Sequence, residues 1–180
     1  MKAKIILSLP DECFVWDHFP TCVPEDQNEH LRAELLNTWN DVWTLAHLKK
    51  DEKGPIRYGY LSLLRTQICE GTFALRIDLY NEKWYMDADE CSLYWDASAV
   101  FGEFYEEYLA KRKKLSHYVL QKEYDNFFLQ QYQGCLTLLH SFVRRNKNEL
   151  LACEAFEKAS LDEPPHLYIG EYNGSVRSLF

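Results

Sequence analysis

The sequence predicts an α+β fold: a small antiparallel sheet, formed by about residues 57–86 plus terminal strands, packed against three or four amphipathic helices. Within that region, apolar residues occupy every second position from Phe73 to Leu79, as in a strand with one buried face. Elsewhere the apolar residues recur at the three-to-four-residue spacing of a helix that buries one stripe. This helical spacing covers three ranges, residues 25–50, 99–115 and 117–145.

Chain length and composition predict one globular domain over residues 1–180. Of these residues 47% are hydrophobic and 15% are aromatic, which is far from the composition of a disordered chain. A chain of this size buries roughly 70% of its unfolded surface, so its core needs no metal or disulfide to stabilise it.

Two features are expected before the first helix. Residues 4–9 predict a short strand that ends at Pro10. Residues 11–24 contain two prolines and three large aromatic residues, Phe14, Trp16 and Phe19. We expect an ordered loop whose rings hold it against the body of the protein.

The first helix is predicted to begin at Glu25. Pro24 and the acidic residues after it favour a helix start, because negative charge there faces the unpaired backbone amides. Gly54-Pro55 marks the end of the helical segment. The apolar stripe consists of Leu31, Leu35, Leu36, Trp39, Val42, Trp43 and Ala46.

The sheet is predicted from the segment that follows. Residues 58–68 and 72–80 alternate apolar and polar side chains, and Glu70-Gly71 between them is a plausible hairpin turn. A third short strand at residues 84–86 would complete an antiparallel meander.

The remaining elements are mostly helical. Residues 99–115 and 117–145 predict two helices, and Gly134 inside the second is expected to permit close packing by a neighbour. A shorter helix is predicted from residue 148 to residue 156. Asn173-Gly174 in the tail predicts a hairpin between two short strands.

Charge and cysteine usage restrict the partners and the compartment. The formal net charge of −8 repels phosphate backbones and anionic membrane surfaces, so a nucleic acid or a membrane is not the expected partner. The same charge suits a basic protein. The six cysteines are dispersed without a Cys-x-x-Cys spacing, which is typical of reduced thiols in a cytoplasmic protein.

The polar residues of the predicted strands form the candidate site. A tight turn at Glu70-Gly71 would place Asp78 opposite Ser62 and Tyr80 opposite Tyr60. Tyrosine and arginine are the residues that supply area and directional hydrogen bonds where proteins dock. The predicted partner-binding residues are Tyr58, Tyr60, Arg76, Asp78 and Tyr80, with Asp87 and Asp89 as an acidic rim. The alternative is an ordinary cross-strand network without a partner.

No motif in the sequence carries a recognisable chemistry. The six histidines are dispersed, and Asp87-Ala-Asp-Glu lacks the glycine and the distal glutamate of a calcium loop. A phosphate loop, a dinucleotide fingerprint and a serine nucleophile elbow are all missing from the 180 residues. We therefore predict no catalytic residue, no metal site and no cofactor.

The resulting hypothesis is a small acidic cytoplasmic protein that binds another protein through surface recognition without catalysis. An inhibitor, an antitoxin-like or immunity-like neutraliser and an adaptor all fit this description. Two alternatives stay open: a hydrolase or transferase that uses Asp78, Arg76 and Tyr80 or a Cys–His pair, and a homodimer that forms through the helix at residues 117–145.

Overall fold

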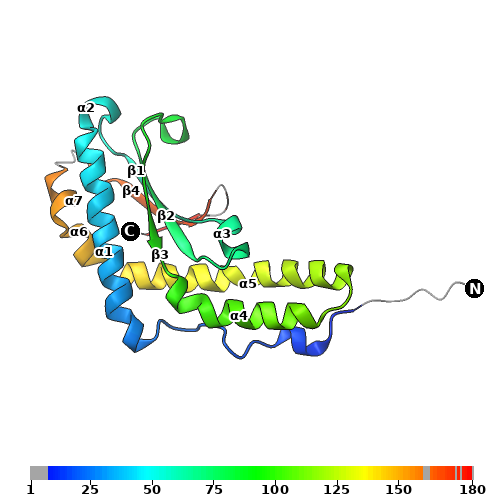
Figure 1. Ribbon diagram of the computed structural model, residues 1–180. Coiled ribbons are helices and arrows are strands. Elements are labelled where there is room, and N and C mark those ends of the chain that lie inside the picture. The colour runs from blue at the N-terminus through cyan, green and yellow to red at the C-terminus, as the bar shows by residue number, and fades with distance from the viewer. Residues whose placement is uncertain (1–7, 160–162, 173, 175, 180) are drawn as a thin grey trace, which may run out of the picture.

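The α+β class is confirmed: within the part of the chain that the structure describes, five strands form one open, mixed and mostly antiparallel sheet, flanked by several helices (Figure 1). The computed structural model describes residues 8–159, 163–172, 174 and 176–179. The strands are β1 (Tyr58–Leu63), β2 (Ala74–Tyr80), β3 (Cys91–Asp96), β4 (His166–Glu171) and β5 (Val176–Ser178). The long helices are α1 (Glu25–Leu48), α4 (Ser98–Lys114) and α5 (Tyr118–Arg145). The short ones are η1 (Asp11–Phe14), α2 (Lys50–Lys53), α3 (Arg65–Cys69), η2 (Trp84–Met86), α6 (Lys147–Leu151) and α7 (Glu154–Lys158).

The strand order is β3-β2-β1-β4-β5, and only the pairing of β1 with β4 is parallel. The prediction of a third strand at residues 84–86 is wrong, because these residues form the 3₁₀ turn η2. The Asp87 carboxylate accepts hydrogen bonds from the backbone N–H groups of Asn81 (3.0 Å) and Asp89 (3.0 Å). These bonds fold residues 81–89 into a loop, so the third antiparallel strand begins only at Cys91.

The register of β1 against β2 differs from the prediction by two residues. Tyr60 lies opposite Asp78 and Ser62 lies opposite Arg76. The predicted strand 58–68 ends at Leu63, because residues 65–69 form α3 and lengthen the connection. A shift of two residues keeps every side chain on its predicted face, since strand side chains alternate with a period of two.

The tight hairpin turn predicted at Glu70-Gly71 is replaced by a longer connection over residues 64–73, in which these two residues follow α3. Gly71 has a φ of +78°, and a Cβ atom at this position would lie 2.3 Å from the ring of Tyr105. Glycine is therefore required both for the left-handed backbone and for the close approach of α4. The Tyr105 hydroxyl also donates a hydrogen bond to the Cys69 carbonyl at 2.9 Å, which fixes α4 to this turn.

The three long helices lie on one side of the sheet (Figure 1). Trp95 on β3 joins two of them: its Nε1 donates to the Leu31 carbonyl of α1 at 3.2 Å, and its ring stacks on Phe142 of α5. Phe73, just before β2, contacts Phe101 of α4 with a centroid distance of 4.7 Å. The predicted ends of these helices agree with the structure within two residues. Among the described residues, no helix combines the length and apolar character needed to cross a membrane.

The apolar stripe of α5 is buried within the chain. Tyr124, Phe128, Leu139 and Phe142 are each at most 2% exposed. A homodimer would therefore need a surface other than this stripe. Gly134 permits close packing as predicted, because a Cβ atom there would lie 2.5 Å from the Phe19 ring.

The segment before α1 runs along α4 (Figure 1). Residues 4–7 of the predicted first strand lie outside the described residues, and residues 8–9 belong to no strand. The rings hold this segment as expected: Trp16 stacks on Phe127 and contacts Phe104 edge-on, and Phe19 also contacts Phe104. The segment is thus part of the core packing.

Glu107 of α4 is the polar anchor of this segment. Its carboxylate, only 8% exposed, accepts the backbone N–H of Asp17 (3.0 Å) and of His18 (2.8 Å), and it pairs with Lys111 at 2.6 Å. Burial alone would raise the pKa of Glu107, but the hydrogen bonds from Lys111, Asp17 and His18 lower it to about 2.

Replacing Glu107 by glutamine is expected to destabilise the protein by about 2 kcal/mol at pH 7, because charge-assisted hydrogen bonds to two backbone amides are weakened. The folded-state pKa lies below the ordinary value, so the stabilisation is complete above pH 4.5 and is lost as the pH falls towards 2. Urea unfolding at pH 7 and at pH 3 measures this effect. The exposed neighbour Glu106 supplies the control variant Glu106→Gln. Equal costs at the two positions would contradict the anchoring role.

The C-terminal part forms two short helices and a hairpin. The single helix predicted from 148 to 156 is interrupted at Cys153, where the Asn40 side chain accepts hydrogen bonds from the Cys153 thiol (3.0 Å) and the Ala155 N–H (3.3 Å). The predicted hairpin is present, because β4 and β5 pair antiparallel. Asn173 of its predicted turn lies outside the described residues.

Candidate functional site

The sheet face opposite the long helices carries the candidate site. Its side chains come from four strands, and the strand register places them together. They are Tyr58, Tyr60, Ser62, Arg76, Asp78, Tyr80, Ser92, Tyr94, His166 and Tyr168, and we call this surface the tyrosine face. The residues that the structure describes place no long helix on it.

Rings form a layer over the centre of the tyrosine face. Tyr60 is only 2% exposed because four rings surround it: Tyr168 at 5.0 Å, Trp84 at 5.7 Å, Tyr85 at 5.9 Å and Tyr80 at 6.0 Å between centroids. Burial and the neighbouring tyrosine hydroxyls raise the pKa of Tyr60, so its phenol stays protonated. Trp84 has a φ of 55°, a conformation that costs a non-glycine residue roughly 1 kcal/mol. The backbone is therefore locally strained at Trp84, where η2 packs over the sheet.

A buried ion pair holds that loop in place. The ammonium of Lys53 is fully buried and donates to Asp87 Oδ2 at 2.6 Å and to the Asp89 carbonyl at 2.5 Å. The Asn81 side chain donates to the Lys53 carbonyl at 2.8 Å and ties the loop to α2. Although burial opposes it, the hydrogen bonds from Lys53, Asn81 and Asp89 lower the pKa of Asp87. The Asp87 carboxylate is therefore charged, and both of its oxygens accept hydrogen bonds.

A second charged cluster lies between β2 and the start of β3. Arg76 Nε donates to Asp78 Oδ1 at 2.7 Å, and Arg76 Nη2 donates to the Glu90 carboxylate. Asp78 is 2% exposed, and its other oxygen, Oδ2, is buried without a hydrogen-bond partner in the described part of the chain. Burial raises the pKa of Asp78 to about 6, although Arg76 lowers it. The carboxyl is thus held close to its titration point at neutral pH.

These groups surround a hollow of about 410 Å³ at the edge of the tyrosine face. Three tyrosines line it, and one guanidinium there faces three carboxylates. The lining residues are Arg76, Asp78, Leu79, Tyr80, Tyr85, Asp87, Ala88, Glu90, Cys91 and Tyr172. Even with Lys53 counted beside Asp87, carboxylates outnumber cations, so the hollow favours positive charge.

Five of the predicted residues lie together on one face of the sheet: Tyr58, Tyr60, Arg76, Asp78 and Tyr80. They differ in how far they are exposed. Tyr60 and Asp78 are buried, so neither offers contact area in the free chain. Asp87, predicted as part of an acidic rim, has a side chain that is 1% exposed and bound to Lys53, so it offers no contact area in the free chain. Asp89 is half-buried and contributes its backbone carbonyl to the same lysine.

Several residues of this site were missed in the sequence. Tyr85, Tyr94 and Tyr172 are 51%, 50% and 37% exposed and supply accessible aromatic surface on or beside the tyrosine face. The alternating pattern of residues 91–96 could have identified Tyr94. The position of Tyr172 follows from the parallel pairing of β4 with β1, which no local pattern indicates.

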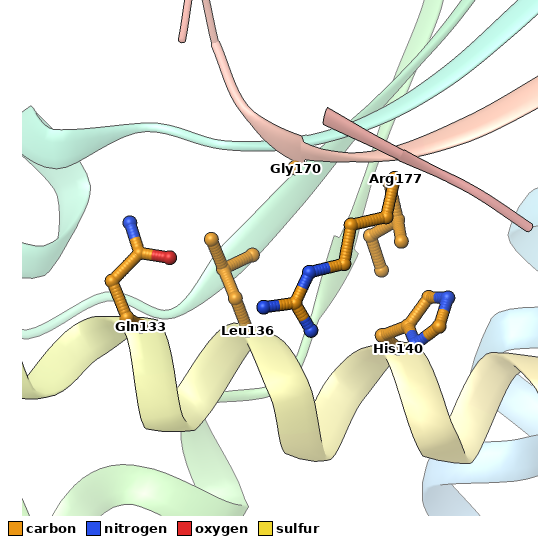
Figure 2. A pocket seen from close by; sticks show the side chains of 6 residues that line it. Gln133, Leu136, His140, Gly170 and Arg177 are labelled. Carbon is orange, nitrogen blue, oxygen red and sulfur yellow. The ribbon is translucent and has the colours of Figure 1, made fainter. Parts of the chain in front are cut away.

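A second hollow lies between α5 and the β4–β5 hairpin. Figure 2 shows Arg177 reaching from β5 towards α5, where Leu136 and His140 lie beside it. Arg177 donates to the Thr137 hydroxyl at 3.3 Å, and His140 Nε2 lies 3.4 Å from the Ser178 carbonyl. Its volume of about 50 Å³ has room for only a few water molecules. It is a packing gap rather than a candidate site.

The chemistry available at other positions is restricted. Within the described residues, no three histidine, cysteine or carboxylate side chains converge as metal ligands would. Burial raises the pKa of the thiols of Cys69, Cys91 and Cys135, which keeps them in the weakly nucleophilic protonated form. The hypothesis of a nucleophilic cysteine is therefore not supported at these three positions.

Comparison with known proteins adds no assignment. No protein-family model, no curated protein and no solved structure matches this chain.

Proposed function

We propose that this chain is a non-catalytic cytoplasmic protein that binds a basic protein partner through the tyrosine face. An inhibitor, an immunity-like neutraliser or an adaptor would act in this way. The observation that carries the proposal is an exposed aromatic surface around a hollow in which carboxylates outnumber cations.

Four of the ten exposed large hydrophobic side chains among the described residues support this assignment. Tyr85, Met86, Tyr94 and Tyr172 all lie on the tyrosine face or on the segments next to it, and Met86 is 83% exposed. Aromatic and methionine side chains are enriched in the centres of protein interfaces. Below them Tyr60 packs against Tyr168 and Trp84, so this layer is already ordered before a partner binds.

Photo-crosslinking in the protein's own cells tests the proposal. A benzoylphenylalanine at position 94 should yield one dominant adduct with a basic protein, whereas the same residue at position 103, exposed on α4, should not. With that partner purified, Tyr94→Ala should weaken binding about tenfold, the size expected for an aromatic interface residue. Tyr118→Ala, at an exposed tyrosine of α5, is the matched control and should leave the affinity unchanged.

The proposal would fall if the adducts at positions 94 and 103 were the same. It would also fall if Tyr94→Ala and Tyr118→Ala lowered the affinity for the purified partner equally. Either result would place the contact surface elsewhere on the chain.

A hydrolase or transferase centred on Asp78 is the second candidate. It is favoured by one observation, a carboxyl with a pKa of about 6 beside a hollow, which is suitable for general acid–base catalysis. Its proposed companion Tyr80 has a pKa raised by burial and by the Asp78 charge, so its phenol is a poor proton donor. The geometry therefore supports binding better than catalysis.

A further inference from the structure

Asp78, which lines the hollow, has a buried acceptor atom without a hydrogen-bond partner among the described residues. Arg76 occupies Asp78 Oδ1 and also pairs with Glu90, whereas Asp78 Oδ2 has no partner among the residues described. A buried carboxylate oxygen without a donor costs stability, which is unusual in a folded protein unless a ligand or another function compensates. Asp78 is one of the residues that line the hollow, so a donor that enters the hollow lies beside this side chain.

The surrounding groups define the donor as a cation. Tyr80, Tyr85 and Tyr172 present aromatic rings, and such faces attract cations through their quadrupoles. Arg76 already lies over the Tyr172 ring at 5.9 Å, which shows that this ring accepts a positive group. The excess of carboxylates over cations in the hollow also favours a positively charged ligand.

The single open oxygen of Asp78 favours one kind of cation. A guanidinium binds a carboxylate best through two oxygens, and Asp78 Oδ1 is already bound to Arg76. An ammonium group is a compact charge that needs only one acceptor together with the tyrosine faces. Asp78 Oδ2 is covered in the free chain, so the ammonium reaches it only when a side chain at the hollow shifts, and Tyr85, which lines the hollow with half its surface exposed, is the side chain we assign to this shift.

We propose that this hollow binds the ammonium group of a lysine side chain, an assignment that rests on the proposed function because the lysine belongs to the basic partner. The ammonium contacts the rings of Tyr80 and Tyr85 and donates to Asp78 Oδ2. Specificity for the partner then comes from a single lysine inserted into an otherwise flat aromatic surface.

Titration of the isotope-labelled full chain with the peptide acetyl-Gly-Lys-Gly-amide tests this site. Amide signals of lining residues such as Tyr80 and Cys91 should shift, with a Kd of about 1–10 mM for a single side chain. The same peptide with an acetylated lysine should bind at least tenfold more weakly. A peptide with arginine in place of lysine should also bind more weakly.

Asp78→Asn should lower the affinity for the lysine peptide at least tenfold, since it preserves the shape and removes the charge. Glu82→Gln removes the same charge from an exposed position outside the hollow and should leave the affinity within twofold. Equal binding of the acetylated peptide, tighter binding of the arginine peptide or an unchanged affinity in Asp78→Asn would overturn the assignment.

The affinity of the unaltered chain for the lysine peptide, measured at several pH values, tests the role of Asp78 without a variant that could misfold. Between pH 7 and pH 5 the affinity should fall about tenfold, because Asp78, with a pKa of about 6, becomes neutral while the lysine stays charged. The charged groups that act on Asp78 are Arg76 on β2, Glu90 before β3 and Lys53 on α2. A Glu90→Gln variant should retain the pH dependence, and a flat profile in either chain would contradict the role of Asp78.

The two proposals fail in different ways. If Tyr94→Ala weakens binding of the crosslinked partner about tenfold but Asp78→Asn does not weaken it, the tyrosine face is the interface and the lysine site is wrong. If the lysine peptide binds but no partner is crosslinked at position 94, the hollow binds amines and the proposed function is wrong.

Discussion

Replacing Lys53 by methionine is expected to destabilise the protein by about 3–5 kcal/mol, because it leaves a buried carboxylate without its cation. The Lys53 and Asp87 side chains are 0% and 1% exposed, so water cannot replace the lost partner. Methionine retains most of the apolar stem and its volume, which confines the change to the charge and its hydrogen bonds. Urea unfolding followed by circular dichroism measures the free energy of unfolding.

Lys50→Met is the matched control, since Lys50 lies in the same short helix and is exposed. We expect it to change stability by less than about 0.5 kcal/mol. In the double variant Lys53→Met/Asp87→Asn, about 1–2 kcal/mol should be recovered, because the uncompensated charge is removed. If Lys53→Met cost no more than Lys50→Met, the buried pair would not stabilise the loop.

The same variant connects stability to the candidate site. Lys53 and Asn81 hold residues 81–89 in the conformation that places Trp84 and Tyr85 over Tyr60. Loss of the pair should therefore loosen the ring layer before the sheet itself unfolds. Faster amide exchange in the loop than in β2 would show this order.

The helices and the central strand could be predicted because their patterns are local. Helical spacing located α1, α4 and α5, and the alternation in β2 placed Arg76, Asp78 and Tyr80 on one face. The register could not be predicted, since α3 depends on the packing of Tyr105 against Gly71. The strand at 84–86 was wrong because the hydrogen bonds of Asp87 bend the chain there.

The site was predictable only where its residues share a strand. Lys53 lies in a run of charged residues that is typical of a solvated helix end, and its burial depends on a carboxylate 34 positions away. Tyr168 stacks on Tyr60 through the pairing of β4 with β1 across more than one hundred residues. Such pairings carry no sequence period, so the aromatic layer emerges only in three dimensions.

Replacing Trp39 by alanine should produce a loss of similar size, about 3–5 kcal/mol, through the removal of buried ring volume. Trp39 on α1 is 1% exposed, and its ring lies 5.8 Å from Trp43 and 6.2 Å from Phe156 of α7. Its Nε1 donates to the Leu150 carbonyl at 3.0 Å, which attaches α6 to α1. Leu48→Ala on the same helix, at a side chain 77% exposed, is the control and should have little effect.

A comparison of Trp39→Phe with Trp39→Ala separates the ring from the hydrogen bond. Phenylalanine keeps most of the packing and loses the bond to Leu150, so its cost should be about 1–2 kcal/mol. The alanine variant should also speed amide exchange in α6 and α7, since these short helices have few contacts apart from α1 and the end of α5. Equal losses in the two variants would mean that the hydrogen bond, and not the ring, fixes the C-terminal segment. That segment precedes β4 in the chain, and β4 carries Tyr168, the ring stacked on Tyr60.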